Sequence, residues 1–209
     1  MSDHDPYTRP EIHGLGLSLR PWEPADADVL LRGFTDPELL RWNTPRRPIA
    51  DLSDARAAIR ARAEGLGRRE LAQFAVTESG TIVGSVGLSG INHHMRRAAV
   101  GYWILPEHRH RSLATCALEL CTRWAFEQGG LHRIELGHAV EHIASCRVAE
   151  RCGYLVEGTK RDGMHEAQRT EAFRDQHLHA RLSTDPPPAL GESYGQSSSR
   201  TQPPPPARR

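Results

Sequence analysis

Between Ala98 and Thr115 the chain reads AAVGYWILPEHRHRSLAT, and this stretch decides the fold. Its first eight residues are apolar on both faces, which is typical of a central strand that is covered on each side, and Pro106 ends that strand. A short basic loop follows, and a helix begins soon after it. Free amides and the positive end of a helix make such a junction an anion site, to which Arg109 and Arg111 add charge. The alternative is an ordinary loop with exposed arginines.

Patterns on either side of this stretch predict an α+β fold. Apolar residues at i, i+3, i+4 and i+7 indicate helices, whereas alternation bounded by Gly or Pro indicates strands. Helices are expected over residues 24–34, 36–42, 51–65, 113–126 and 143–151. Strands are expected over residues 17–20, 71–77, 81–88, 98–105, 133–138, 154–157 and 172–182.

The composition of the chain describes one compact globular domain. The chain has 209 residues, 38% of them hydrophobic, and a formal net charge of +1. We expect a flexible N-terminus over residues 1–13, one domain over 14–182 and a disordered Pro/Ser-rich tail over 183–209, because the tail has few apolar side chains. A Pro-rich ligand for a partner domain is the alternative for the tail. Without a long apolar run or a secretion signal, we expect a cytoplasmic protein that does not contact membranes.

Cysteine and histidine spacings predict no metal site. The cysteines lack CxxC spacing and fall in helical segments, which favours reduced, buried thiols over disulfides or zinc; they are Cys116, Cys121, Cys146 and Cys152. The pairs His108-x-His110 and His177-x-His179 each place two side chains on one face of an extended segment. Two ligands without a third nearby do not make a zinc site.

Three motifs in a fixed order carry a resemblance to a known family. The strand Val100–Ile104 reads VGYWI and is followed by Pro-Glu, residues 109–115 read Arg-x-x-Ser-x-Ala-Thr, and residues 147–154 read RVAERCGY. Together they resemble the GNAT acyltransferase superfamily, in its RimJ/RimL-like branch of N-acetyltransferases. The resemblance covers about residues 17–182. It implies the GNAT fold, with a mixed central sheet of about seven strands, splayed between strands 4 and 5, and helices on both faces.

The resemblance also implies an acetyl-CoA site. The pantetheine arm would lie in the gap between the central strand and strand 133–138, and the pyrophosphate would sit on the amides of the basic loop. Two glycine positions of the family's loop are Ser112 and Ala114 here; a side chain at the first crowds the phosphates, although a serine hydroxyl can bond a phosphate oxygen. The implied cofactor-binding residues are Ile104, Leu105, Arg109, His110, Arg111, Ser112, Leu113, Ala114, Thr115, His142 and Ser145.

The implied reaction is attack of a neutral amine on a thioester carbonyl, which calls for a base, an oxyanion site and an acid for the thiolate. Ser145 aligns with the family's serine near the sulfur, and capping of the helix is its alternative role. Candidate bases are Glu135, His138 and His142. Ala99 stands where many relatives carry Glu, and an amine that arrives neutral needs only proximity.

The acceptor pocket is expected to involve the N-terminal helices and the loop before the central strand. Its ligand would be the primary amine of a peptide N-terminus, of a small metabolite or of an aminoglycoside-like antibiotic. The candidate substrate-binding residues are Arg41, Trp42, Asn43, His93, His94 and Arg96.

Two other functions stay open on the sequence. The first is a GNAT-fold transferase with an acyl- or aminoacyl-tRNA donor, because Ser112 departs from glycine and arginines at positions 56, 60, 62, 68, 69, 96 and 97 could contact RNA. The second is a non-catalytic binding module, suggested by Ala99 and His142 at functional positions of the family. A homodimer is expected from the resemblance alone.

Overall fold

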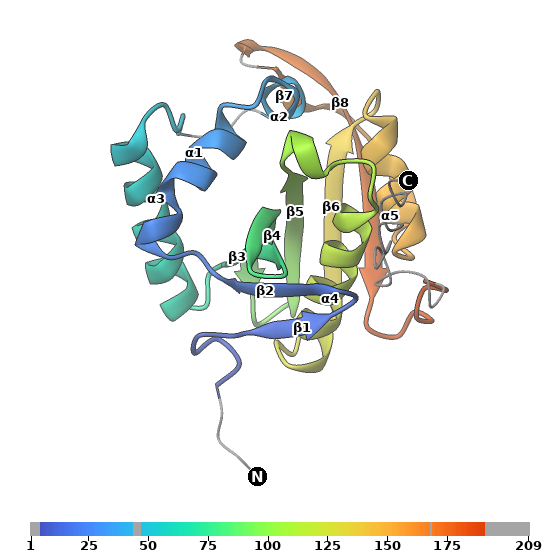
Figure 1. Ribbon diagram of the computed structural model, residues 1–209. Coiled ribbons are helices and arrows are strands. Elements are labelled where there is room, and N and C mark those ends of the chain that lie inside the picture. The colour runs from blue at the N-terminus through green and yellow to red at the C-terminus, as the bar shows by residue number, and fades with distance from the viewer. Residues whose placement is uncertain (1–4, 44–46, 168, 191–209) are drawn as a thin grey trace, which may run out of the picture.

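A computed structural model describes residues 5–43, 47–167 and 169–190 (Figure 1). Its centre is an eight-stranded sheet in the order β1-β2-β3-β4-β5-β6-β8-β7. Neighbouring strands are antiparallel except for β5 and β6, which are parallel. The strands are β1 (Ile12–Gly14), β2 (Leu17–Pro21), β3 (Ala72–Glu78), β4 (Thr81–Asn92), β5 (Arg97–Ile104), β6 (Arg133–Ala139), β7 (Leu155–Glu166) and β8 (Arg169–Leu182).

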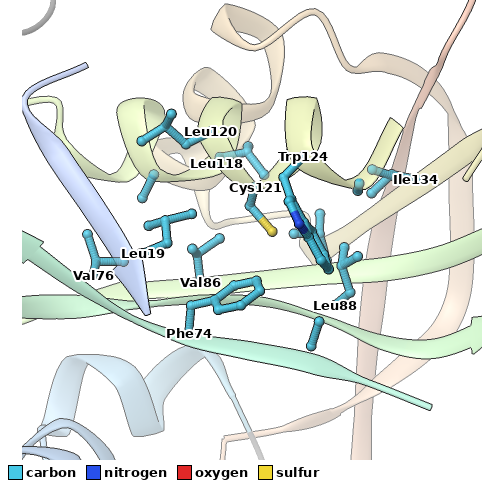
Figure 2. Close-up of a cluster of buried hydrophobic side chains, with 14 of the residues drawn as sticks. Leu19, Phe74, Val76, Val86, Leu88, Leu118, Leu120, Cys121, Trp124 and Ile134 are labelled. Atoms are coloured by element: carbon cyan, nitrogen blue, oxygen red, sulfur yellow. The ribbon is translucent and has the colours of Figure 1, made fainter. Parts of the chain in front are cut away.

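Helices lie on both sides of the sheet, with α1 and α3 on one side and α4 and α5 on the other (Figure 1). Alternate residues of β3 divide the core: Phe74 packs in the cluster beneath α4, whereas Ala75 packs in the cluster beneath α1 and α3. Figure 2 shows Leu118 and Trp124 of α4 lying over Phe74 and Val86. The helices are α1 (Ala27–Phe34), α2 (Pro37–Trp42), α3 (Leu52–Gly67), α4 (Leu113–Glu127) and α5 (Ile143–Arg151), with 3-10 turns η1 (Pro24–Asp26) and η2 (Pro106–His108).

Local sequence explains where two of these helices begin. The side chain of Asp36 accepts hydrogen bonds from the backbone amides of Glu38 and Leu39, and Pro37 occupies the first helical position of α2. The side chain of Asp51 caps α3 in the same way by accepting from the Asp54 amide. Aspartate at each cap satisfies amides that have no partner inside the helix.

The strands β5 and β6 pair over three residues and then part. Their parallel register runs from Arg97 opposite Arg133 to Ala99 opposite Glu135. None of the described residues in the second half of β5 pairs with β6, although β4 follows β5 as far as Ile104 and β6 keeps its register with β8. The predicted splay between two central strands is therefore confirmed, and this edge of β5 has no strand partner beyond the point where the strands part.

The predicted α+β class and mixed sheet are confirmed, and the strand count differs. The sheet has eight strands instead of about seven because the short β1 pairs with β2. The strand expected over residues 154–157 extends to Glu166, and the last strand begins at Arg169. Most of β7 is exposed, so its sequence carries little of the alternation that predicts strand length.

The ends of the expected domain lie differently in the structure. Tyr7 is buried and its ring packs edge-on against Trp124, and β1 begins at Ile12, so the folded region starts before residue 14. Of the expected tail, residues 183–190 are described and 191–209 lie outside the described residues. No helix in the described part of the chain is long and apolar enough to cross a membrane.

A buried ion pair joins α4 to β8. Glu119 is fully buried, and one of its carboxylate oxygens accepts a 2.6 Å bond from Arg181, which is 5% exposed. Its other oxygen accepts from Arg123 at 2.7 Å. Arg181 also donates to the carbonyl oxygen of Cys152 at the end of α5. The pair therefore fastens the two helices of one face to the sheet.

Glu119→Leu should destabilise the fold strongly, because it leaves the Arg181 guanidinium buried without its carboxylate. We expect the free energy of unfolding in urea to fall by about 3–5 kcal/mol. The double variant Glu119→Leu/Arg181→Met replaces both charges by apolar groups and should recover most of that loss. A single variant within about 1 kcal/mol of the wild type would show that the pair is dispensable.

Candidate active site

The first turn of α4 offers uncapped amides at the end of the parted strands. Ser112 precedes the helix in the left-handed region, at φ 59°, and its side chain makes no capping bond. The first bond of the helix runs from the Cys116 amide to the Ser112 carbonyl oxygen, so the amides of Leu113, Ala114 and Thr115 come before it. The first turn also carries no acidic residue. Such a helix start favours an anion.

The two arginines of the loop are held by carboxylates of the protein itself. Arg109 donates to the side chain of Asp36 and, at 3.0 Å, to the carbonyl oxygen of Ile104. Arg111 donates to Glu78 at 2.8 Å. The arginines therefore shape the loop and tie it to α2 and β3, and the anion site depends mainly on backbone amides.

The chain turns sharply where β5 ends. The amide of Leu105 donates to the carbonyl oxygen of Val83 at 2.9 Å, and its own carbonyl oxygen accepts from the amide of His108 at 3.0 Å. A carbonyl oxygen has two lone pairs, so the carbonyls of Ile104 and Leu105 can each accept a second bond from a ligand in the gap.

A hydroxyl pair spans the gap from β5 to α5. The Oγ atom of Ser145 lies 2.9 Å from the Oη atom of Tyr102, and Ser145 is 7% exposed. Burial raises the pKa of Tyr102, so its hydroxyl keeps its proton and can donate it to Ser145. The N-cap of α5 is His142, which makes no side-chain capping bond. Tyr102 was not among the candidate site residues predicted from the sequence; its place in the VGYWI strand, on the same face as Val100, is the signal that could have found it.

The three candidate bases lie in different surroundings. His142 stacks on Trp42, with ring centroids 4.4 Å apart, and burial lowers its pKa to about 4, which makes it a weak base. His138 is buried, and burial also lowers its pKa. Glu135 accepts a 2.9 Å bond from Arg133 and lies one residue along β6 from the buried Ile134, so it faces the opposite side of the sheet.

Glu135 lines a cavity of about 780 Å³ on that opposite side. Ala99 lies beside it in the strand register, and the cavity also reaches β7 and β8. The other charged or polar residues that line it are Ser89, Arg97 and Lys160, none of which the sequence indicated as an acceptor-binding residue. The cavity therefore lies beside the paired start of β5 and β6, next to the point where they part.

Three of the predicted acceptor residues lie together at the end of α2. Arg41 lies over the ring of Trp42 at 4.8 Å, and Arg174 of β8 lies 5.6 Å from the same ring. Asn43 follows α2 and its side chain donates to the Leu39 carbonyl oxygen. This group adjoins His142 through the stacked Trp42 ring.

The other three predicted acceptor residues are not brought to this group. His93, His94 and Arg96 lie in the turn between β4 and β5, whereas Arg109 ties α2 to the opposite end of β5. An eight-residue strand, about 26 Å long, separates the two ends. His93 and Arg96 are engaged there with the carbonyl oxygens of Arg69 and Gly130.

The sequence shows no third ligand near either His-x-His pair, and the structure overturns this premise for the pair in β8. The structure brings His138 and Cys146 to His177 and His179, with one donor atom from each residue within 4.8 Å of the others. The spacing in β8 reveals two of these residues, and the other two arrive from β6 and α5. No such group of the described residues includes the pair in the 108–110 loop.

The arginines considered for an RNA surface are largely engaged within the chain. Arg68 pairs with Glu70, and Arg69 pairs with Asp5. Arg62 lies over the ring of Phe34. Arg56, Arg60 and Arg97 are exposed, so donation from an acyl- or aminoacyl-tRNA stays an alternative.

Comparison with known proteins agrees with this geometry. Residues 17–155 match the family model described as "Acetyltransferase (GNAT) domain". "Putative ribosomal N-acetyltransferase YdaF" of Bacillus subtilis (strain 168) is 35% identical over 86 residues, which are 41% of this chain and 47% of YdaF, so the match spans about half of that relative. "Uncharacterized N-acetyltransferase p20" of Bacillus licheniformis is 29% identical over 150 residues, 70% of this chain and 83% of p20.

A solved structure shares the fold. "Mycobacterium smegmatis RimJ in complex with CoA-disulfide" superposes with a TM-score of 0.77 at 21% sequence identity, over 84% of this chain and 88% of that chain. The family model covers well over half of the sequence, so the chain belongs to the GNAT acetyltransferase family.

Proposed function

We propose that this protein is an N-acetyltransferase that takes an acetyl group from acetyl-CoA and passes it to a primary amine in a ternary complex. One observation carries the proposal: the gap between β5 and β6 lies between the uncapped start of α4 and the pair of hydroxyls on Tyr102 and Ser145. Family membership supports the reaction class, and the RimJ neighbour bound to CoA-disulfide supports the donor.

The residues at the start of α4 fit a diphosphate. Three amides precede the first bond of the helix, and no acidic residue in its first turn repels an anion. Ser112, whose backbone is left-handed, joins the loop to the first turn of α4. Successive amides at such a turn can form a concave site for an anion. We propose that the amides of Leu113, Ala114 and Thr115 hold the pyrophosphate of acetyl-CoA.

Acetyl-CoA supplies an acyl carbon that accepts the amine and a thiolate that must be protonated. Ser145 is the proposed proton donor to that sulfur, and Tyr102 is positioned to hold the serine hydroxyl and to return a proton to it. Glu135 is the proposed base on the other side of the sheet, where it lines the cavity. The amine would enter from that cavity and the donor from the face of α4 and α5.

The acceptor is proposed as a primary amine on a peptide N-terminus or a small molecule. The cavity places a carboxylate, Glu135, beside two cationic side chains, Arg97 and Lys160. The carboxylate of Glu135 would attract the ammonium group of the acceptor. Arg97 and Lys160 would attract a carboxylate on the same acceptor. A mass-spectrometric screen of amine metabolites, amine antibiotics and peptides separates the two classes.

Ser112 tests the anion site. A φ of 59° suits glycine and excludes β-branched side chains. Ser112→Val should therefore weaken CoA binding about tenfold, which corresponds to about 1.4 kcal/mol. Ser112→Gly is the matched control and should stay within about threefold of the wild type. Isothermal titration with CoA measures the affinities. Equal affinities for the wild type and both variants would show that the loop at Ser112 does not contribute to CoA binding.

Ser145 and Tyr102 test the acid. Ser145→Ala should lower kcat about 100-fold with little change in KM for acetyl-CoA, because only the protonation of the leaving thiolate is lost. Tyr102→Phe keeps the serine and should lower kcat by about tenfold. Thiol release from acetyl-CoA measures both. Wild-type kcat in Ser145→Ala would exclude the role, and no thiol release by the wild type with any amine tested would favour a binding module.

Glu135 tests the base. Glu135→Gln should lower kcat by about 100-fold, because the amide cannot accept the ammonium proton. Glu157→Gln is a matched control, because Glu157 also accepts from Arg133 but does not line the cavity. Equal losses in the two variants would show that the effect passes through Arg133.

A further inference from the structure

Four potential metal ligands meet behind the first turn of α5. His138 lies opposite His177 in the register of β6 and β8, and His179 follows on the same face of β8 two residues later. Cys146 comes from α5, one residue after Ser145. One donor atom from each of the four lies within 4.8 Å of the other three. The proposed acetyl transfer assigns no role to this group.

Backbone carbonyls fix the tautomers of two of the rings. The Nδ1 atom of His138 lies 2.8 Å from the Ala139 carbonyl oxygen, and the Nδ1 atom of His179 lies 3.3 Å from the Tyr154 carbonyl oxygen. A carbonyl oxygen only accepts, so each Nδ1 carries the proton. In neutral rings both Nε2 atoms then present lone pairs, and these two atoms lie 3.0 Å apart. Two lone pairs at this distance repel unless a cation lies between them.

The other two residues complete the ligand set. The Sγ atom of Cys146 lies 3.8 Å from the Nε2 atom of His179. The Nδ1 atom of His177 is buried and has no hydrogen-bond partner in the described part of the chain. A buried polar atom without a partner is costly, and a metal ion would satisfy it.

Two of the distances between donor atoms lie near those of a tetrahedral ion, and the widest separation in the group, up to 4.8 Å, would have to shorten when an ion binds. Bonds of about 2.0–2.1 Å to histidine nitrogen and 2.3 Å to thiolate sulfur place the ligand atoms of a tetrahedral zinc site about 3.3–3.6 Å apart. The distances of 3.0 Å between the two nitrogens and 3.8 Å between nitrogen and sulfur lie on either side of that range. The hydrogen bonds from each Nδ1 to a carbonyl are those that orient metal-bound histidines in known sites.

We propose that His138, Cys146, His177 and His179 form a binding site for a divalent transition-metal ion, for which three nitrogens and one thiolate make Zn²⁺ the best chemical match. Binding would replace the thiol proton of Cys146, which passes to solvent, and four protein ligands would leave no open position for a substrate. The ion would fasten α5 to β6 and β8. The residue next to Cys146 is Ser145, so the metal would also fix the turn that carries the proposed acid.

The test uses the full-length chain without a histidine tag, stripped with a chelator and titrated with Zn²⁺ or Co²⁺. The wild type should bind one ion per chain, and its Co²⁺ form should show the visible bands of tetrahedral cobalt and a thiolate charge-transfer band. Cys146→Ser should abolish the charge-transfer band and weaken binding at least tenfold. His177→Ala should weaken binding at least tenfold, and it sacrifices no hydrogen bond of the buried Nδ1 atom.

His13→Ala removes an exposed histidine far from the cluster in sequence and serves as the matched control, which should bind like the wild type. Circular dichroism before metal addition shows that each variant is folded. Zn²⁺ should raise the unfolding temperature of the wild type and of the control, and should raise that of His177→Ala by less. The proposal would be overturned if the wild type bound Zn²⁺ no more tightly than the folded Cys146→Ser and His177→Ala variants. A proton shared between the Nε2 atoms of His138 and His179 would then explain why these atoms lie so close.

Discussion

The early parting of β5 and β6 is the constraint on which the rest of the candidate site depends. Parallel pairing ends at Ala99 and Glu135, because β6 follows β8 while β5 follows β4. The backbone N–H and C=O groups on the open edge of β5 have no neighbouring strand to bond, so they need another hydrogen-bond partner. One side of the gap carries the start of α4 and the hydroxyls of Tyr102 and Ser145, and the cavity lined by Glu135 lies on the other side of the sheet, where the two strands still pair. The proposed entry of the donor from one side of the sheet and of the acceptor from the other depends on this gap.

Much of the fold could be predicted from local pattern. The apolar stripe of α4 and the boundaries of α5 follow from side-chain periodicity, and the caps of α2 and α3 follow from single aspartates. The short β1 could not be predicted, because a strand of three residues is too short to show a period. The full length of β7 could not be predicted either, because most of it is exposed and its apolar and polar residues do not alternate. The splay between the central strand and the strand at residues 133–138 followed from the resemblance to a family and not from periodicity.

The site could be predicted only where its residues are neighbours in sequence. The loop before α4 and the position of Ser145 are local features, whereas the contact between Ser145 and Tyr102 joins residues 43 positions apart. The same limit explains the metal-ligand cluster, since spacing shows His177 and His179 but not the two residues that β6 and α5 deliver. Conversely, His93 and His94 looked close to the acceptor site because they precede β5, yet they lie at the far end of that strand.

The most direct test of the central claim is amide NMR of the ¹⁵N-labelled protein during titration with CoA. The account predicts saturable shifts and slowed hydrogen exchange at Leu113, Ala114 and Thr115, together with shifts beside the gap at Ile104 and Ser145. The exposed turn at His93 and His94 should not respond. Saturation at amides elsewhere, or no response at the start of α4 with CoA in large excess, would contradict the claim that the parted strands and this helix form the donor site.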